Sequence, residues 1–87
     1  MSNFFPDRLN AVDPKRVGLA AFSCIDRLQR FTPEQQVAAA AIVLQLQCRR
    51  FNAHVGTVLN VANNVIDRTI HETPQLGAVR EYVKHEL

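Results

Sequence analysis

The sequence predicts an all-α protein, a small bundle of about four helices that forms a single domain over residues 1–87. At three places a residue with a capping side chain directly precedes a proline: Asp13-Pro14, Thr32-Pro33 and Thr73-Pro74. This is the pattern of a helix N-cap followed by the first helical residue. Apolar residues recur at helical spacing between these points, and no segment alternates apolar and polar residues with a period of two. Strands are therefore not expected.

The first helix is predicted over residues 14–30, after an N-terminal arm at 1–12. Asp13 is its expected N-cap. Five apolar residues at spacings of four, three, four and three form one stripe along it. These residues are Val17, Ala21, Cys24, Leu28 and Phe31. The stripe predicts the face that this helix buries.

The second helix is predicted over residues 33–50 and begins at a capping box formed by Thr32 and Gln35. Its middle is rich in alanine and apolar nearly all the way round, which is typical of a helix buried on more than one side. We therefore expect it to be either the central helix of the domain or the seam of a homo-oligomer, such as a homodimer. The short chain has few helices to surround it and favours the seam. The interface residues expected on this helix are Val37, Ala38 and Ala41.

The third and fourth helices are predicted over residues 53–68 and 74–85. Asn52 is a plausible N-cap for the third helix, which carries apolar residues at positions i, i+3, i+4 and i+7. Gly18 and Gly56 lie within predicted helices, where we expect them to allow close packing. On the fourth helix, Glu81 and His85 are four residues apart and can pair on the surface.

Composition and spacing indicate a non-enzymatic protein. Ten basic and eight acidic residues give a formal net charge of +2, lower than is usual for a dedicated nucleic-acid-binding protein of this size. Cys24 and Cys48 are too few for a disulfide framework and are expected to be buried free thiols, which fits a cytoplasmic protein. The three histidines form no metal-binding spacing. We expect no catalytic residues, cofactor or metal, and no membrane span.

An alternative function is suggested by residues 44–61, which resemble a helix-turn-helix with Cys48, Asn52 and Val58 at its key positions. The third helix would then read DNA bases, and arginines before it would contact phosphates. The candidate nucleic-acid residues are Arg49, Arg50, His54, Thr57, Asn60 and Asn64. Gln47 stands where the motif prefers an apolar residue, and Asn52 stands where glycine is usual. An ordinary antiparallel helix pair with a solvated polar face explains the same pattern.

Two aromatic residues, Phe4 and Phe5, precede Pro6 outside any predicted helix. Either they fold back over the end of the helical core, or they form an arm that docks onto a protein partner or a second subunit.

The run from Phe31 to Gln36, the apolar helix after it, and the segment from Cys48 to Phe51 are similar to small helical accessory proteins encoded by bacteriophages and prophages. The resemblance covers about residues 31–83. It implies an accessory factor that binds a host or phage protein, and it assigns no functional residues. The leading expectation is therefore a protein-binding accessory or regulatory module, with a helix-turn-helix regulator as the alternative.

Overall fold

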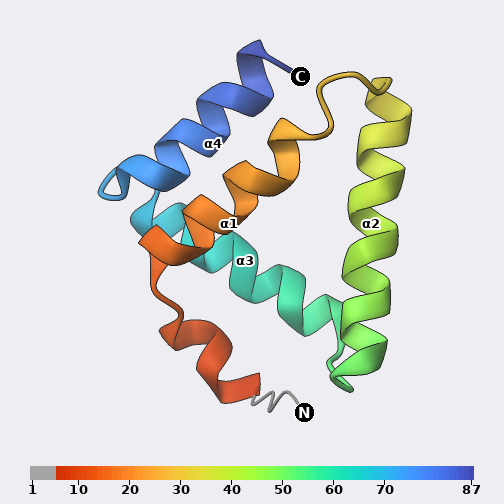
Figure 1. Cartoon of the computed structure of the whole chain (residues 1–87). Coiled ribbons are helices and arrows are strands. Elements are labelled where there is room, and N and C mark those ends of the chain that lie inside the picture. Colours follow the sequence, from red (N-terminus) through yellow and green to blue (C-terminus); the bar gives the residue numbers. More distant parts are fainter. Residues whose placement is uncertain (1–5) are drawn as a thin grey trace.

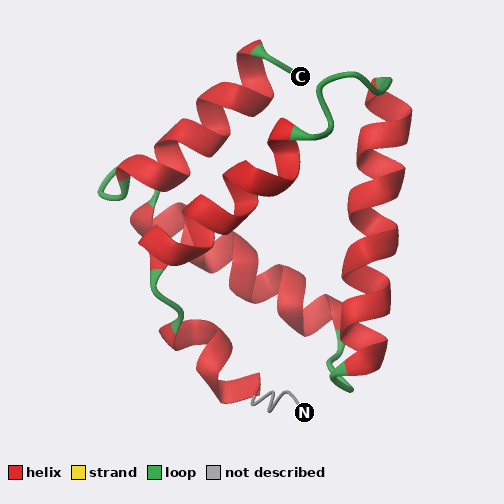
Figure 2. Cartoon of the chain, in the orientation of Figure 1, coloured by secondary structure: helices red, strands yellow, loops and turns green. Residues whose placement is uncertain are grey.

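A computed structural model describes residues 6–87, which form one short 3₁₀ helix and four α-helices (Figures 1 and 2). No strand occurs in residues 6–87, so the predicted all-α class with four α-helices is confirmed. In chain order the elements are η1 (Pro6–Ala11), α1 (Pro14–Asp26), α2 (Pro33–Arg50), α3 (Val55–Thr69) and α4 (Pro74–His85).

The predicted capping signals start all three proline-led helices, and at two of them the cap itself forms. Asp13 Oδ1 accepts a hydrogen bond from the Lys15 backbone N–H at 3.0 Å. Thr32 and Gln35 form the reciprocal capping box, with bonds of 3.0 and 3.2 Å. At the third, Thr73 is the N-cap and proline follows it as predicted, but the expected capping hydrogen bond is wrong, because the buried Thr73 side chain makes none.

α1 is shorter than predicted, because the chain turns after Asp26 instead of continuing as a helix to residue 30. The N–H groups of Arg27 and Leu28 bond to carbonyls three residues back, which tightens the chain out of the α-helix. Gln36 Nε2 then donates to the backbone oxygens of Leu28 and Phe31, at 3.0 and 2.9 Å, and holds the turn.

The start of α3 also differs from the prediction. Asn52 has a left-handed backbone (φ 54°), so it belongs to the turn and is not the N-cap. His54 takes the capping role, with its Nδ1 accepting from the Thr57 N–H at 3.4 Å. Near the N-terminus, residues 6–11 were expected to belong to an arm outside any helix. In the structure they form the 3₁₀ helix η1. The predicted arm residues Phe4 and Phe5 lie outside the described residues.

α1 and α4 run side by side and make the closest helix pair (Figure 1). Gly18 is buried against α4, where an added Cβ would lie 2.7 Å from Gln75 Cβ. The rings of Phe22 and Tyr82 meet edge to face with centroids 5.0 Å apart. The close packing expected of Gly18 is confirmed, whereas Gly56 is exposed and its expected packing role is wrong.

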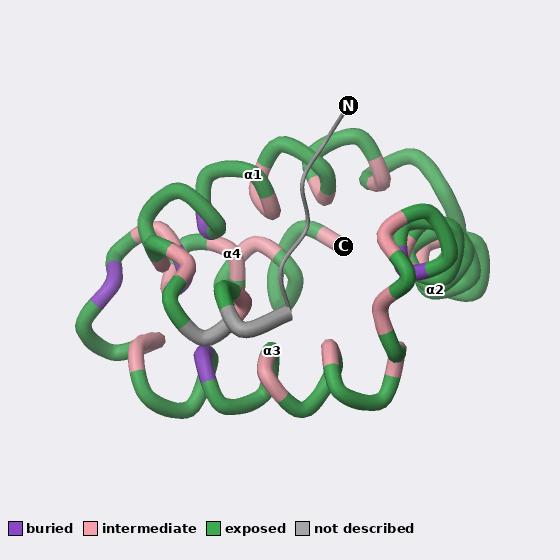
Figure 3. The backbone as a smooth tube through the Cα atoms, turned by 90° about the horizontal axis from the view of Figure 1, so that it is seen from below, coloured by how far each residue is buried: buried purple, intermediate pink, exposed green. Residues whose placement is uncertain are grey.

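α2 lies to one side of the other helices, as its end-on view in Figure 3 shows. Most of its length faces solvent, and its contact with α3 lies beside the turn, where Cys48 is buried. The prediction of a central helix is therefore wrong for this chain. The physical reason is that the turn at residues 51–54 directs α2 away from α3, so the other helices cannot surround it.

The hydrophobic core is thin. The buried apolar residues are Cys48, Val65 and Leu76, and none of the described side chains is less than 2% exposed. Both cysteines are free, but Cys24 is exposed, so its predicted burial is wrong. α1 instead turns the face of Gly18 and Phe22 to α4. Three of the five residues of the predicted stripe, Val17, Cys24 and Phe31, are therefore exposed. Within residues 6–87, no helix has both the length and the apolarity that crossing a membrane requires.

Candidate functional site

An apolar groove of about 600 Å³ lies between η1, α1, α3 and α4. It is lined by valine, isoleucine, leucine and alanine side chains, with Arg80 as the charged residue among them. Representative lining residues are Val17 and Ala21 on α1, Val61 and Ile66 on α3, and Val79 and Val83 on α4. Of the described residues that line it, none belongs to α2.

The groove exists because its walls do not meet. The stripe on α3 that periodicity predicts does face α1 and α4, and Val65 on it is buried. However, α1 and α4 pack far more closely on each other than on α3. Figure 3 shows α1 and α3 on opposite sides of the molecule. Of the residues that line the space between them, Val65 and Leu76 are buried and the others are half-buried or exposed. Val17, Ile66 and Val83 consequently remain exposed although they line the groove.

α2 carries apolar side chains on two opposite faces. At 100° per residue, Leu44 and Cys48 share one side of the helix, while Ile42, Val43 and Leu46 share the other. The first pair is seated on the same chain, at a cavity of about 210 Å³ beside the α2–α3 turn. The other three side chains are exposed. The exposed face of α2 is therefore as apolar as its seated face.

The cavity at the turn and the groove form one continuous apolar surface. Leu9 of η1 and Val58 of α3 line both. The combined surface extends from the C-terminal end of α2, past η1, to α4.

The predicted protein-interface residues on α2 lie near its N-terminal end. Val37, Ala38 and Ala41 are all exposed. They cover part of the seated face and the edge next to it, so they are separate from the exposed stripe at residues 42, 43 and 46.

The helix-turn-helix positions come together at the α2–α3 turn. Cys48 is buried, its carbonyl accepts from the Ala53 N–H at 2.8 Å, and Val58 lies half-buried beside it. Asn52 adopts the left-handed conformation that a glycine supplies most readily, and asparagine is among the few other residues that tolerate it. The unusual turn residue is therefore compatible with the geometry.

The candidate nucleic-acid residues are all exposed, but they are not all free. Arg49, Thr57, Asn60 and Asn64 present their side chains on the surface of α2 and α3. The His54 ring caps α3 through Nδ1. The Arg50 guanidinium lies over the Phe51 ring, 5.4 Å from its centroid.

Polar contacts elsewhere tie α4 to α1. The Tyr82 hydroxyl donates to Asp26 Oδ1 at 2.9 Å and to Gln29 Oε1 at 3.3 Å, and Gln29 Nε2 donates to Glu86 Oε2 at 3.4 Å. Partial burial, together with the Asp26 carboxylate, raises the pKa of Tyr82 above its usual value. These hydrogen bonds have a structural role, because they link the C-terminal ends of α1 and α4.

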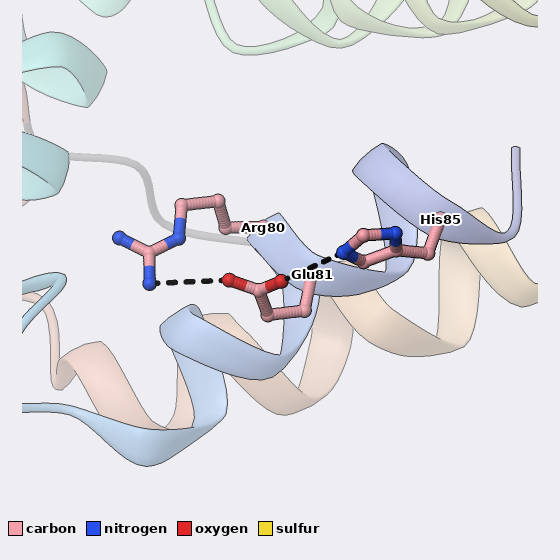
Figure 4. Close-up of polar contacts among 3 residues, drawn as sticks. All are labelled: Arg80, Glu81 and His85. Atoms are coloured by element: carbon pink, nitrogen blue, oxygen red, sulfur yellow. Dashed lines mark ion pairs between the residues drawn. The ribbon is translucent and has the colours of Figure 1, made fainter.

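Glu81 forms two surface ion pairs, with Arg80 at 3.4 Å and with His85 at 3.2 Å (Figure 4). The predicted pairing of Glu81 with His85 is confirmed. Both pairs are about half exposed, where such pairs contribute little to stability. Among the described residues, no three His, Cys, Asp or Glu side chains gather as a metal site would require.

Comparisons with protein-family models, with characterised proteins and with solved structures find no match to this chain. The apolar residues of α2 and of the α3 stripe could be located from the sequence. The groove could not, because its walls come from two distant parts of the chain, residues 9–21 and 58–83, and no local pattern indicates which helices fail to close.

Proposed function

We propose that the protein is a non-enzymatic, protein-binding accessory or regulatory module that self-associates through α2. The observation that carries this proposal is the exposure of large apolar side chains on that helix: Val37 is 72% exposed, Ile42 59% and Leu46 57%. Complete burial of such a side chain contributes about 1.5–3 kcal/mol. Large apolar side chains that are exposed together, as Ile42, Val43 and Leu46 are on one face of α2, are typical of an interaction site.

The predicted partner-binding face is the N-terminal part of α2, with Val37, Ala38 and Ala41. The small alanine side chains let a partner helix approach the backbone closely, and Val37 projects beyond them. On sequence grounds alone, Phe4 and Phe5 are proposed as a second contact with the same partner.

We also propose that the module is encoded by a phage or prophage and acts in the cytoplasm on a host or phage protein. The support is the sequence pattern of residues 31–83. The two free thiols, one of them exposed, suit a reducing compartment.

An affinity capture from bacterial lysate tests partner binding, at low and high salt and with and without nuclease. We expect the chain to capture a protein that stays bound at high salt and after nuclease treatment. The Val37→Asp variant should no longer capture that protein. Leu19→Asp is the matched control, because Leu19 is also exposed but lies on α1 outside the groove. Equal capture by both variants, or no captured protein, would contradict the proposal.

A small helix-turn-helix DNA-binding regulator is the second candidate, favoured by the geometry of the α2–α3 turn around Asn52. In this role α3 would read bases through Thr57, Asn60 and Asn64, with Arg49 and Arg50 on phosphates. Binding to duplex DNA should then fall steeply with salt.

The double variant Arg49→Ala and Arg50→Ala distinguishes the second candidate. It should weaken duplex binding, whereas Arg27→Ala with Arg30→Ala, which removes the same charge from the α1–α2 connection, should not. An equal loss in both double variants would indicate a nonspecific charge effect and would rule out reading by α3.

A further inference from the structure

We propose that the apolar groove is filled by α2 of a second copy of this chain. The two copies are related by a two-fold axis, and each docks its α2 into the groove of the other, an arrangement called the exchange below. The inference rests on the self-association part of the proposed function and adds where the helix docks. The docking face is the exposed stripe formed by Ile42, Val43 and Leu46.

The groove cannot be filled by α2 of the same chain. α2 joins α3 through the short turn at residues 51–54, whose shape is fixed by the left-handed Asn52 and by the bond between the Ala53 N–H and the Cys48 carbonyl. From this turn the two helices diverge (Figure 1), and the groove-lining residues of α3 continue from Val58 to Ile70, away from α2. Folding α2 back into the groove would require that turn to be broken.

The stripe and the groove match in character, and the stripe is short enough to fit the groove. Both are apolar, and Arg80 is the charged residue on the groove wall. The stripe, residues 42–46, spans about 6 Å along its helix, and the α3 wall between Val58 and Ile70 spans about 18 Å. One stripe therefore fits within the length of one groove.

The exposed area indicates how much surface a second copy would cover. The chain exposes 6795 Å², about 1,600 Å² more than the roughly 5,200 Å² typical of a folded monomer of 9.8 kDa. Its radius of gyration, 13.3 Å, also exceeds the roughly 12 Å expected for 87 residues.

That excess is large enough to form a dimer interface. Covering it on two copies would bury about 3,200 Å² in total, within the roughly 2,000–5,000 Å² of permanent homodimers. Even half of the excess equals the roughly 800 Å² that each partner gives to a standard interface. A two-fold axis supplies two stripe-in-groove contacts at once, which closes the assembly at two copies.

Disulfide cross-linking of the full chain tests the exchange. In a Cys24→Ser background, where the remaining native thiol of Cys48 is buried, Val43→Cys and Ile66→Cys are placed in separate chains of different mass and co-expressed. We expect mild oxidation to give a disulfide between the two chain types. Leu59→Cys is the matched control on α3: it is exposed but outside the groove, and should not cross-link to Val43→Cys.

Sedimentation equilibrium provides the second readout. The unmodified chain should be a dimer, and Val43→Asp or Leu46→Asp should be a monomer that retains its helical circular dichroism. Leu59→Asp should remain a dimer.

The outcomes separate this inference from the proposed function. A dimer in which Val43→Cys cross-links only with itself would mean that α2 packs on α2, and would overturn the exchange while self-association stands. A strictly monomeric chain would overturn both the exchange and self-association. Protein capture through Val37 would still be judged by the lysate experiment.

Discussion

Replacing Gly18 by alanine tests how α1 and α4 are held together. The added Cβ would lie 2.7 Å from Gln75 Cβ, 2.9 Å from the Gln75 carbonyl carbon and 3.0 Å from the Leu76 nitrogen. Two of these three are backbone atoms, so rotating a side chain cannot relieve the overlap. α1 and α4 would have to separate along their closest contact.

Two opposing effects set the magnitude. Overpacking of this kind costs about 1–3 kcal/mol. Alanine in place of glycine inside a helix regains up to about 1 kcal/mol. We therefore expect Gly18→Ala to lower the free energy of unfolding by up to about 2 kcal/mol, the difference of these two effects. In a domain of this size that corresponds to a fall in Tm of up to roughly 16 °C.

Gly77→Ala is the matched control, because Gly77 also lies in a helix but an added Cβ there would be 3.8 Å from the nearest atom, the Ile70 carbonyl oxygen. It should be neutral or stabilise the protein by up to about 1 kcal/mol. Both variants are compared by thermal denaturation followed by circular dichroism at one protein concentration, because self-association makes Tm concentration-dependent. If Gly18→Ala were as stable as Gly77→Ala, the close helix contact would be refuted.

Three further predictions concern a helix cap, a hydrogen bond between α4 and α1, and a turn. Thr32→Ala removes half of the capping box and should cost about 1 kcal/mol, seen first as faster hydrogen exchange in α2, which has few packing contacts to hold it; uniform exchange throughout would contradict this. Tyr82→Phe removes the bond to Asp26 and should lower Tm at neutral pH. Because the pKa of Tyr82 is raised in the folded protein, its contribution is present below about pH 10, the pKa in the unfolded chain, and is lost as pH rises through the folded value. The difference between wild type and Tyr82→Phe should therefore shrink in chemical denaturation above pH 10, and a constant difference would argue against the bond. Asn52→Gly should leave the free energy of unfolding unchanged or slightly raised, while Asn52→Val should lower it by about 1–2 kcal/mol or more, since a β-branched residue resists a left-handed backbone.

The number of helices and most of their boundaries could be predicted because they depend on local interactions. The bounds of α2 and α4 match the prediction, since a proline fixes the start of each. The errors in α1 and α3 are also informative. The end of α1 is set by Gln36, a residue of the next helix, and the start of α3 by the backbone of Asn52.

Periodicity also predicted which residues share a face, but not which neighbour each face meets. The stripe with Cys24 was expected to be buried, whereas the face with Gly18 packs on α4, because the absence of a side chain there allows the closest approach between helices.

The sequence by itself thus determined an all-α chain, the starts of its three proline-led helices and an α2 that is apolar nearly all the way round. Only the tertiary structure decided that α2 stands apart and that a groove opens between η1, α1, α3 and α4. The physical reason is that helix formation and amphipathicity arise within about four residues along the chain. The packing of helices depends instead on the turns that aim them and on contacts between residues more than fifty positions apart, such as that of Gly18 with Gln75.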